Sequence, residues 1–420
     1  MSQSIIAAII FLLTYAIIVT ERVHRTTAAL LGGMLMLWFG GLDQKAALQA
    51  IDLNVILLLV GMMVIAYYLG ETGVFQWMAI HAVRIGRGHP VTVMAIIAVM
   101  TAIASALLDN VTVVVLIAPV TLYVASTLGV SPIPFLITEV MASNIGGAAT
   151  LIGDPPNILI GSRANMDFVD FLVNMAPPAL MALAAYIGVM YIQFRNALDV
   201  SPERRVAVMR LETRGLITRP DLLLKSGIVL LLVVIGFLLH GMLHIAPATV
   251  ALSGATLLLL WTRTDPYEVL QHVEWATLMF FVGLFIAVEG IVQAGVIEWV
   301  AEEVLLLTRE NLTITTLFIL WGSAVASGIV DNIPYTATML PIVESLGRVM
   351  PVEPLWWALA LGADFGGNLT LVGASANVVV ASLAERSGHR MTFKMFLRYG
   401  VLTVLVSLTV ATAWLWWQFL

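Results

Sequence analysis

Apolar runs about 20 residues long recur along this chain, and they restrict its fold more than any other feature. A helix needs about 20 apolar residues to cross the roughly 30 Å hydrocarbon core of a bilayer. The candidate spans are 4–20, 27–42, 53–70, 91–128, 176–194, 225–243, 246–262, 275–290, 313–347 and 399–418. The first is interpreted as a transmembrane helix and not as a signal peptide, because no small-residue cleavage pattern follows it. The sequence therefore predicts an all-α polytopic membrane protein with about ten transmembrane helices.

The composition excludes several classes of protein. Of the 420 residues, 60% are hydrophobic and 11% are charged, whereas soluble domains carry about 25% charged residues. The net charge of -6 provides no basic field for nucleic acid. The chain has no cysteine, which excludes disulfides, thiolate metal sites and thiol catalysis. Since no nucleophile–base or metal constellation is visible either, we expect a protein that is not an enzyme and binds no cofactor or metal.

The distribution of basic residues predicts the topology. The apolar segments 134–160 and 355–383 are interrupted by Gly and polar residues, and we interpret them as re-entrant hairpins. With that interpretation, all but Lys45, Arg163 and Arg309 of the 20 Lys and Arg residues face the cytoplasm, as the positive-inside rule requires. The prediction is a multi-pass protein of a prokaryotic plasma (inner) membrane, in contact with the lipid bilayer, with both termini outside.

The chain contains an internal repeat. Asp109-Asn110 and Asp331-Asn332 are 222 positions apart, and Asn144 and Asp364 begin a second set of matches 220 positions apart. Each half holds five predicted spans and one hairpin, and since five is odd, the halves would have inverted topology, an architecture typical of secondary transporters. The predicted units are a first repeat (1–195), a basic cytoplasmic linker (196–224) and a second repeat (225–420).

The two Asp-Asn pairs lie in the middle of segments too long for one plain helix. A carboxyl group inside a membrane is costly and marks a functional site by default. We therefore predict that each pair lies at a break in its helix, where Asp109 and Asp331 take up protons or ions and Asn110 and Asn332 contact substrate. The structural alternative is that these aspartates cap half-helices, and capping could coexist with transport.

Polar and glycine residues recur at the tips of the two predicted hairpins. Glycine pairs permit close backbone approach, and Asn and Thr side chains can bind a polyhydroxyl solute or a cation. The alternative is a tight turn buried between helices. Asp364 joins the predicted coupling residues, and the predicted substrate-binding residues of this set are Asn144, Gly146, Gly147, Thr150, Asn157, Gly366, Gly367, Asn368, Thr370 and Asn377.

The ionisable residues predicted inside the membrane are mostly acidic, and no Lys or Arg is predicted in the middle of a span. Besides the coupling residues they include Asp154 and Glu139. A dicarboxylate carrier would have only helix dipoles and bound sodium to balance its substrate. This charge pattern favours a transporter of cations or protons, or one that moves a neutral solute against protons.

The segment Ser143-Asn144-Ile145-Gly146-Gly147-Ala148-Ala149-Thr150-Leu151-Ile152-Gly153-Asp154-Pro155-Pro156-Asn157 resembles a signature of the ion-transporter superfamily. That superfamily contains the arsenite efflux permeases (ArsB), the NhaD sodium/proton antiporters, the P-protein branch, and the citrate and dicarboxylate carriers. The resemblance covers nearly the whole chain and implies a transport-plus-scaffold fold that forms a homodimer. In the arsenite branch, a soluble ATPase partner on the linker is also conceivable.

Departures from the family pattern narrow the prediction. The dicarboxylate branch carries Ser-Asn-Thr at both hairpin tips, whereas this chain has Ile145-Gly146-Gly147 after its first Ser-Asn and Ala363-Asp364 in the second tip. The favoured hypothesis is proton-coupled efflux of a small inorganic solute, arsenite or antimonite as the neutral trihydroxide, by alternating access. The first alternative is a sodium/proton antiporter, and an anion or dicarboxylate carrier ranks below it.

Overall fold

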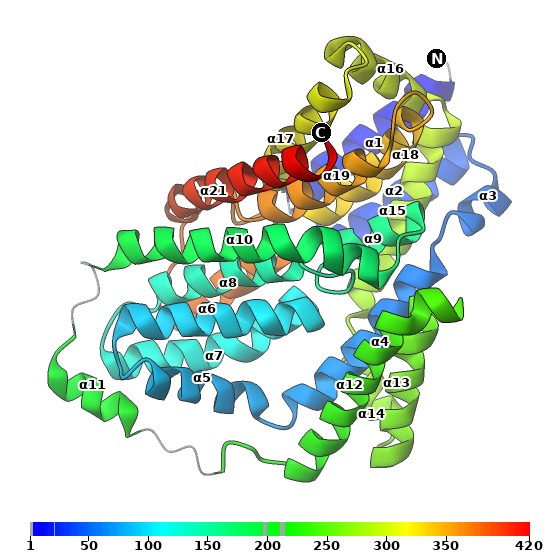
Figure 1. Ribbon diagram of the computed structural model, residues 1–420. Helices are drawn as coiled ribbons and strands as arrows, with labels where there is room; N and C mark the ends of the chain where they lie inside the picture. The colour runs from blue at the N-terminus through cyan, green and yellow to red at the C-terminus, as the bar shows by residue number, and fades with distance from the viewer. Residues whose placement is uncertain (1–2, 21, 196–199, 211–214) are drawn as a thin grey trace.

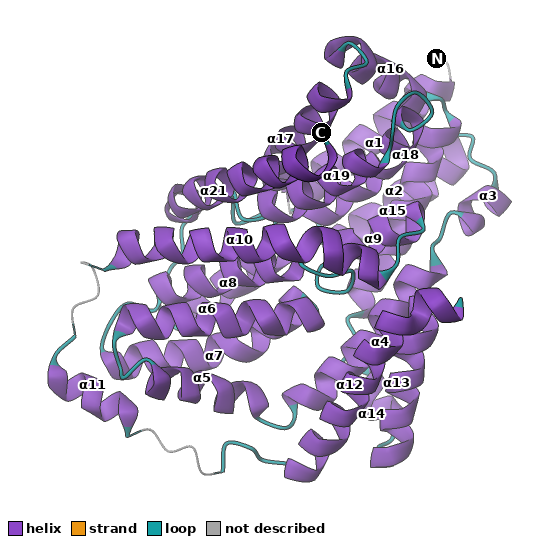
Figure 2. Ribbon diagram, viewed as in Figure 1, coloured by secondary structure: helices purple, strands orange, loops and turns teal. Residues whose placement is uncertain are grey.

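The computed structural model describes residues 3–20, 22–195, 200–210 and 215–420, and the regular structure in these ranges is helical (Figure 1, Figure 2). The first half contains α1 (Gln3–Thr20), α2 (Arg25–Phe39), α3 (Gln44–Gln49), α4 (Leu53–Gly70), α5 (Val74–Ile85), α6 (Pro90–Leu107), α7 (Asn110–Leu128), α8 (Ile133–Gly147), α9 (Pro155–Ala164) and α10 (Phe168–Phe194). The predicted linker 196–224 carries α11 (Pro202–Met209), and its residues 196–199 and 211–214 lie outside the described ranges.

The second half begins with a long apolar helix that starts at Pro220, inside the predicted linker. Its helices are α12 (Pro220–Leu243), α13 (Pro247–Thr262), α14 (Pro266–Leu270), α15 (Trp275–Gln293), α16 (Val296–Thr308), α17 (Leu312–Val330), α18 (Asn332–Leu346), α19 (Glu353–Gly366), α20 (Ser375–Arg386) and α21 (Phe393–Phe419). Within the described residues, nine helices are long and apolar enough to cross a membrane, and α13 is a shorter apolar helix of 16 residues. The chain is a multi-pass membrane protein.

The predicted span 91–128 is not one helix. The chain forms α6, of 18 residues, and α7, of 19 residues, and each is long enough to count as a span. The helices separate because Leu108 and Asp109 take extended backbone conformations between them. Predicted span 313–347 divides in the same way into α17 and α18 at Asp331. Predicted span 27–42 overlaps α2 (Arg25–Phe39), which has only 15 residues.

The helices on either side of each Asp-Asn pair contact one another, as α6 and α7 do in Figure 1. The helices on either side of each Gly-rich segment have different neighbours. Helix α8 packs against α6 and α7, whereas α9 packs against α18 and α19 of the other half. Helix α20 likewise packs against α7 and α8. The two halves therefore exchange short helices around the site, while the re-entrant assignment of 134–160 and 355–383 stays a prediction.

Two close helix contacts occur at equivalent positions of the two halves. A Cβ atom at Gly61 of α4 would overlap Ala251 of α13, and a Cβ atom at Gly283 of α15 would overlap the backbone of Ala29 of α2. The two glycines are 222 positions apart, and so are the two alanines. The same pairing of a glycine with an alanine thus brings one helix of each half against a helix of the other. Small residues at such contacts let helix backbones approach closely within a membrane.

The variant Gly283→Val should be less stable than the wild-type protein, because the added side chain meets the Ala29 backbone. Overpacking of this kind costs about 1–3 kcal/mol. Thermal unfolding of the purified protein in detergent would measure the loss as a lower Tm. The matched control is Gly227→Val in α12, where no atom lies within 4 Å of an added Cβ. Equal Tm values for the two variants would contradict the close contact.

Candidate functional site

The candidate site lies where four chain breaks meet. Two are the Asp-Asn breaks, between α6 and α7 and between α17 and α18. The other two are the loop 148–154 between α8 and α9, which we name loop A, and the loop 367–374 between α19 and α20, which we name loop B. Glycines permit this convergence, since a Cβ at Gly146 would overlap the backbone of Ala102, and a Cβ at Gly366 would overlap that of Ala324.

Side chains of loops A and B, and of the helices that follow them, hold the loops in place. The hydroxyl of Thr150 donates to the Ala106 carbonyl, and that of Thr370 donates to the Gly328 carbonyl, at 2.5 and 2.6 Å. The Nδ2 of Asn157, in α9, donates to the Thr150 carbonyl at 3.0 Å. The corresponding Nδ2 of Asn377, in α20, donates to the carbonyls of Gly367 and Thr370, both at 2.8 Å. The predicted turn role is therefore present, and substrate binding by these residues stays a prediction.

A cluster of buried amides joins the two halves. The Nδ2 of Asn144 donates to the Oδ1 of Asn368 at 2.9 Å and to the Oδ1 of Asn377 at 3.0 Å. The Nδ2 of Asn368 in turn donates to the carbonyl of Met141 at 3.2 Å. The side chains of all three asparagines are fully buried. Asn144 lies 224 positions before Asn368 and 233 positions before Asn377. The fold therefore brings together predicted site residues from both repeats.

Asp154 occupies the centre of a second polar cluster. Its Oδ2 accepts a hydrogen bond from Asn110 at 2.7 Å, and its Oδ1 accepts one from Asn332 at 3.2 Å. The Asn110 amide also reaches Asn144, at 3.3 Å. Asp154 is 1% exposed and makes no capping bond to α9, although it directly precedes that helix. A single carboxyl group thus binds both Asp-Asn breaks.

The sequence predicted Asp154 only as an acidic residue inside the membrane, and not as a residue of the site. Asp154 stands immediately before Pro155-Pro156, a position at which an aspartate is ordinarily interpreted as a helix cap and not as part of a binding site. The partners of its carboxylate lie 44 and 178 positions away, and no local pattern indicates them.

The aspartates of the two breaks cap helices, as the structural alternative predicted. The Oδ2 of Asp109 accepts from the backbone N–H and the hydroxyl of Thr112, at 2.9 and 3.0 Å. The Oδ1 of Asp331 accepts from the N–H of Ile333 at 3.0 Å, and its Oδ2 accepts from Ser375 at 3.2 Å. Asp331 also has φ +97°, which L-residues adopt rarely and which marks a constrained position.

One cation reaches the site from outside the four breaks. Arg25, the first residue of α2, lies 3.5 Å from the Oδ2 of Asp331 and donates a hydrogen bond to the hydroxyl of Ser375. Its guanidinium also lies over the ring of Phe280. The sequence places no basic residue in the middle of a span, and Arg25 reaches the break from a helix end. The acidic site therefore has one basic neighbour in these contacts.

The space between these groups is small. A cavity of about 20 Å³ is lined by Asp109, Asn110, Asp154, Asn332 and Ser375, among others, which is room for about one water molecule. A wider recess of about 320 Å³ lies beside it, lined on its polar side by His24, Arg25, Glu274, Asp331 and Ser375. Three of these residues, Arg25, Glu274 and Ser375, line both spaces. A solute larger than water would enter the site only after the surrounding helices move.

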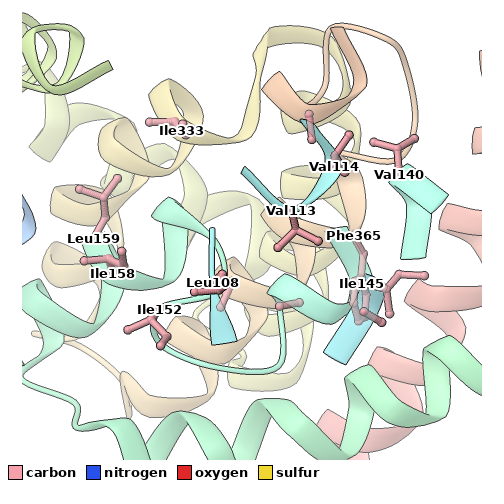
Figure 3. Close-up of a cluster of buried hydrophobic side chains, with 14 of the residues drawn as sticks. Leu108, Val113, Val114, Val140, Ile145, Ile152, Ile158, Leu159, Ile333 and Phe365 are labelled. Carbon is pink, nitrogen blue, oxygen red and sulfur yellow. The ribbon is translucent and has the colours of Figure 1, made fainter. Parts of the chain in front are cut away.

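Apolar side chains seal the polar clusters. Figure 3 shows Leu108, Ile145, Ile152, Ile333 and Phe365 in a cluster of buried hydrophobic side chains, and each of them is at most 4% exposed. They come from both halves of the chain. Because bulk water is excluded, an unpaired polar atom here is more costly than at the surface.

Broken helices around a buried polar site between the two halves of a multi-pass protein are typical of membrane transporters. The chain belongs to the citrate transporter family (CitMHS), whose model matches residues 15–362. It is 46% identical over 425 residues to an uncharacterized transporter of Mycobacterium tuberculosis, with 99% of each chain covered. It is 33% identical to the human P protein over 500 residues, which covers 99% of this chain and 60% of the P protein.

The fold resembles that of a solved transporter structure. The YdaH transporter of Alcanivorax borkumensis matches with a TM-score of 0.57 and 17% identity, over 88% of this chain and 86% of that one. The match confirms the predicted fold class, an all-α polytopic membrane protein. Membership of the citrate transporter family, together with similarity to the P protein, confirms the superfamily indicated by the motifs.

Proposed function

We propose that this protein is a proton-coupled secondary transporter that exports a small neutral polyhydroxyl solute, the trihydroxide of As(III) or Sb(III), by alternating access. The observation that carries the proposal is the bridge formed by Asp154, whose buried carboxylate binds Asn110 and Asn332 from the two halves. Protonation of a carboxylate at this place would weaken both bonds, so proton uptake would be coupled to the relative position of the halves. Asp109, Asp331 and Asp364 are the further coupling residues in this proposal.

The chemistry of the site suits a neutral cargo better than an anion. Asparagine amides both donate and accept hydrogen bonds, as hydroxyl groups do. Citrate, the substrate in the family's name, carries several carboxylates, and the carboxyl groups of Asp109, Asp154 and Asp331 would repel it. Arg25 alone of the contacts described above would balance that charge. With no cysteine in the chain, As(III) would be bound through its hydroxyl groups.

Sodium/proton exchange is the second candidate function. The observation that favours it is the cavity of about 20 Å³, which leaves room for a single small ion. For either function we propose that the protein lies in a prokaryotic inner membrane with both termini outside, and that it forms a homodimer. A soluble ATPase partner is part of the arsenite proposal alone.

Transport by everted membrane vesicles would separate the two candidates. With a proton gradient imposed, acid inside, we expect vesicles containing the protein to accumulate As(III), and an uncoupler to abolish the accumulation. Vesicles from cells that lack the protein are the control. Arsenite efflux is contradicted if As(III) does not accumulate while added sodium dissipates the proton gradient, because that result is the one expected of a sodium/proton antiporter.

A further inference from the structure

The two halves carry carboxyl groups at different positions of the site. Asn144 of α8 corresponds to Asp364 of α19, being 220 positions apart, and Asp154 corresponds to Ala374 at the same offset. Each half therefore has one carboxyl group in this region, but at a different place. Asn144 and its hydrogen-bond partners can therefore be compared directly with Asp364, which occupies the equivalent position in the other half. The cluster around Asn144 shows how that position is fully hydrogen-bonded.

In the first arrangement, donors and acceptors match. Asn377 fixes its own orientation by donating its Nδ2 to two carbonyls of loop B, which leaves its Oδ1 to accept from Asn144 at 3.0 Å. Asn157, the counterpart of Asn377, likewise donates its Nδ2 to the carbonyls of Gly147, Ala148 and Thr150. This orientation leaves its Oδ1 as a buried acceptor without a donor.

Asp364 lies beside Asn157 from the other half, but its carboxyl oxygens do not form a hydrogen bond with the Asn157 amide in the geometry described. Asp364 is fully buried, and no donor among the described residues lies in hydrogen-bonding geometry with its Oδ1 or Oδ2. The Oδ1 of Asn157 is buried and lacks a donor as well. An ionised Asp364 would place three buried acceptor atoms together without any donor, which costs far more than a satisfied pair.

The neighbouring charge points the same way. Helix α19 is packed against α8, α9, α10, α17, α18 and α21, and Asp154, at the start of α9, interacts electrostatically with Asp364. Asp154 receives hydrogen bonds from two asparagine amides, which stabilise its carboxylate form, whereas Asp364 receives none. Two like charges in a buried site do not both persist, and the group without donors is the one that is neutralised.

We propose that Asp364 is protonated in this conformation and donates its hydrogen to the Oδ1 of Asn157, so that this pair is a proton-binding site of the transporter. Release of the proton leaves a carboxylate facing the Asn157 oxygen and Asp154, and both repel it. Loop A and the start of α9 then separate from α19. The coupling role rests on the proposed transport function, whereas the protonation of Asp364 does not.

Infrared spectroscopy of the purified protein in detergent tests this proposal without any cargo. At neutral pH, the wild-type protein should show the C=O band of a protonated carboxylic acid, shifted by exchange into D2O. The band should be lost in Asp364→Asn, whose amide can donate to Asn157 as Asn144 does to Asn377. The matched control is Glu139→Gln, which removes another fully buried carboxyl, bonded to Thr121, and should leave the Asp364 band in place.

One result would overturn the proposal: a spectrum of Asp364→Asn with the same carboxylic acid intensity as the wild type, which would mean that Asp364 is ionised. A band that is present without sodium and lost when sodium is added supports the proposal, because sodium would then displace the proton from the pair. Should Asp364→Asn fail to fold, Asn157→Ala serves instead, and it should move the band to higher frequency because the acceptor is gone; an unmoved band would contradict the pair. A protonated Asp364 in a protein that moves no As(III) would refute only the proposed cargo.

Discussion

The variant Asp154→Asn should lose most of its transport activity, with a rate about 10- to 100-fold below that of the wild type. The carboxylate of Asp154 accepts one hydrogen bond from Asn110 and one from Asn332. A hydrogen bond to a charged group contributes about 1.5–3 kcal/mol, and 1.4 kcal/mol is a factor of about ten. An asparagine in this place offers one acceptor oxygen in place of two, and its NH2 group would face another amide donor.

The measurement is the initial rate of proton-driven uptake into everted vesicles, normalised to the amount of protein in the membrane. Asp43→Asn is the matched control, since it also exchanges a carboxylate for an amide, but Asp43 only caps the short helix α3. We expect that control to transport at the wild-type rate. A wild-type rate in Asp154→Asn with unchanged pH dependence would contradict both the bridge and its coupling role.

The breaks in the helices were predictable because the motifs that mark them occur in both halves of the chain. Asp109-Asn110 and Asp331-Asn332 recur at one offset, and the Gly-rich segments that contain Gly146 and Gly366 recur at another. A polar pair in the middle of an apolar run cannot remain in a plain lipid-facing helix without cost. The location of each break follows from local sequence alone, and the structure shows helices ending at these residues.

The partners of the polar groups were not predictable in the same way. Whether Thr150 and Asn157 face a substrate or hold loop A depends on where the carbonyls of Ala106 and Thr150 lie, which tertiary packing decides. The same holds for Arg25, which the topology placed with the cytoplasmic basic residues. Its contact with Asp331 joins positions 306 residues apart and follows from tertiary packing, in which α2 lies against α1 and α15, not from any pattern in the sequence.

The difference between the halves is the feature that an inverted repeat alone does not explain. Equivalent positions carry Asn144 and Asp364, and Asp154 and Ala374. In a fully symmetric site, each pair of equivalent positions would carry either two carboxyl groups or none. The asymmetric arrangement has one carboxylate that receives donors from both halves and one carboxyl without donors. Such a pair has distinct proton affinities, which a transporter needs if one group is to bind a proton while its neighbour remains ionised.

The variant Arg25→Met should transport on the order of tenfold more slowly, since it removes charge-assisted hydrogen bonding between α2 and the second break. Arg25 contacts Asp331 and Ser375, and it lines both the small cavity and the recess of about 320 Å³ beside it. Methionine keeps most of the length of the side chain without its charge. We expect the helices around the recess to separate more often in this variant, and the recess to become more accessible to water.

Cysteine labelling measures that accessibility directly, because the chain has no cysteine of its own. Val378→Cys places a thiol in the recess, where Val378 is 39% exposed. A membrane-impermeant maleimide should label it in everted vesicles, and faster when Arg25→Met is present. Ser387→Cys, on the exposed end of α20, is the control and should react at one rate in both backgrounds. If Arg25→Met leaves the labelling of Val378→Cys unchanged, Arg25 does not hold the recess closed. Its contact with Asp331 would then contribute charge near the site without controlling access to it.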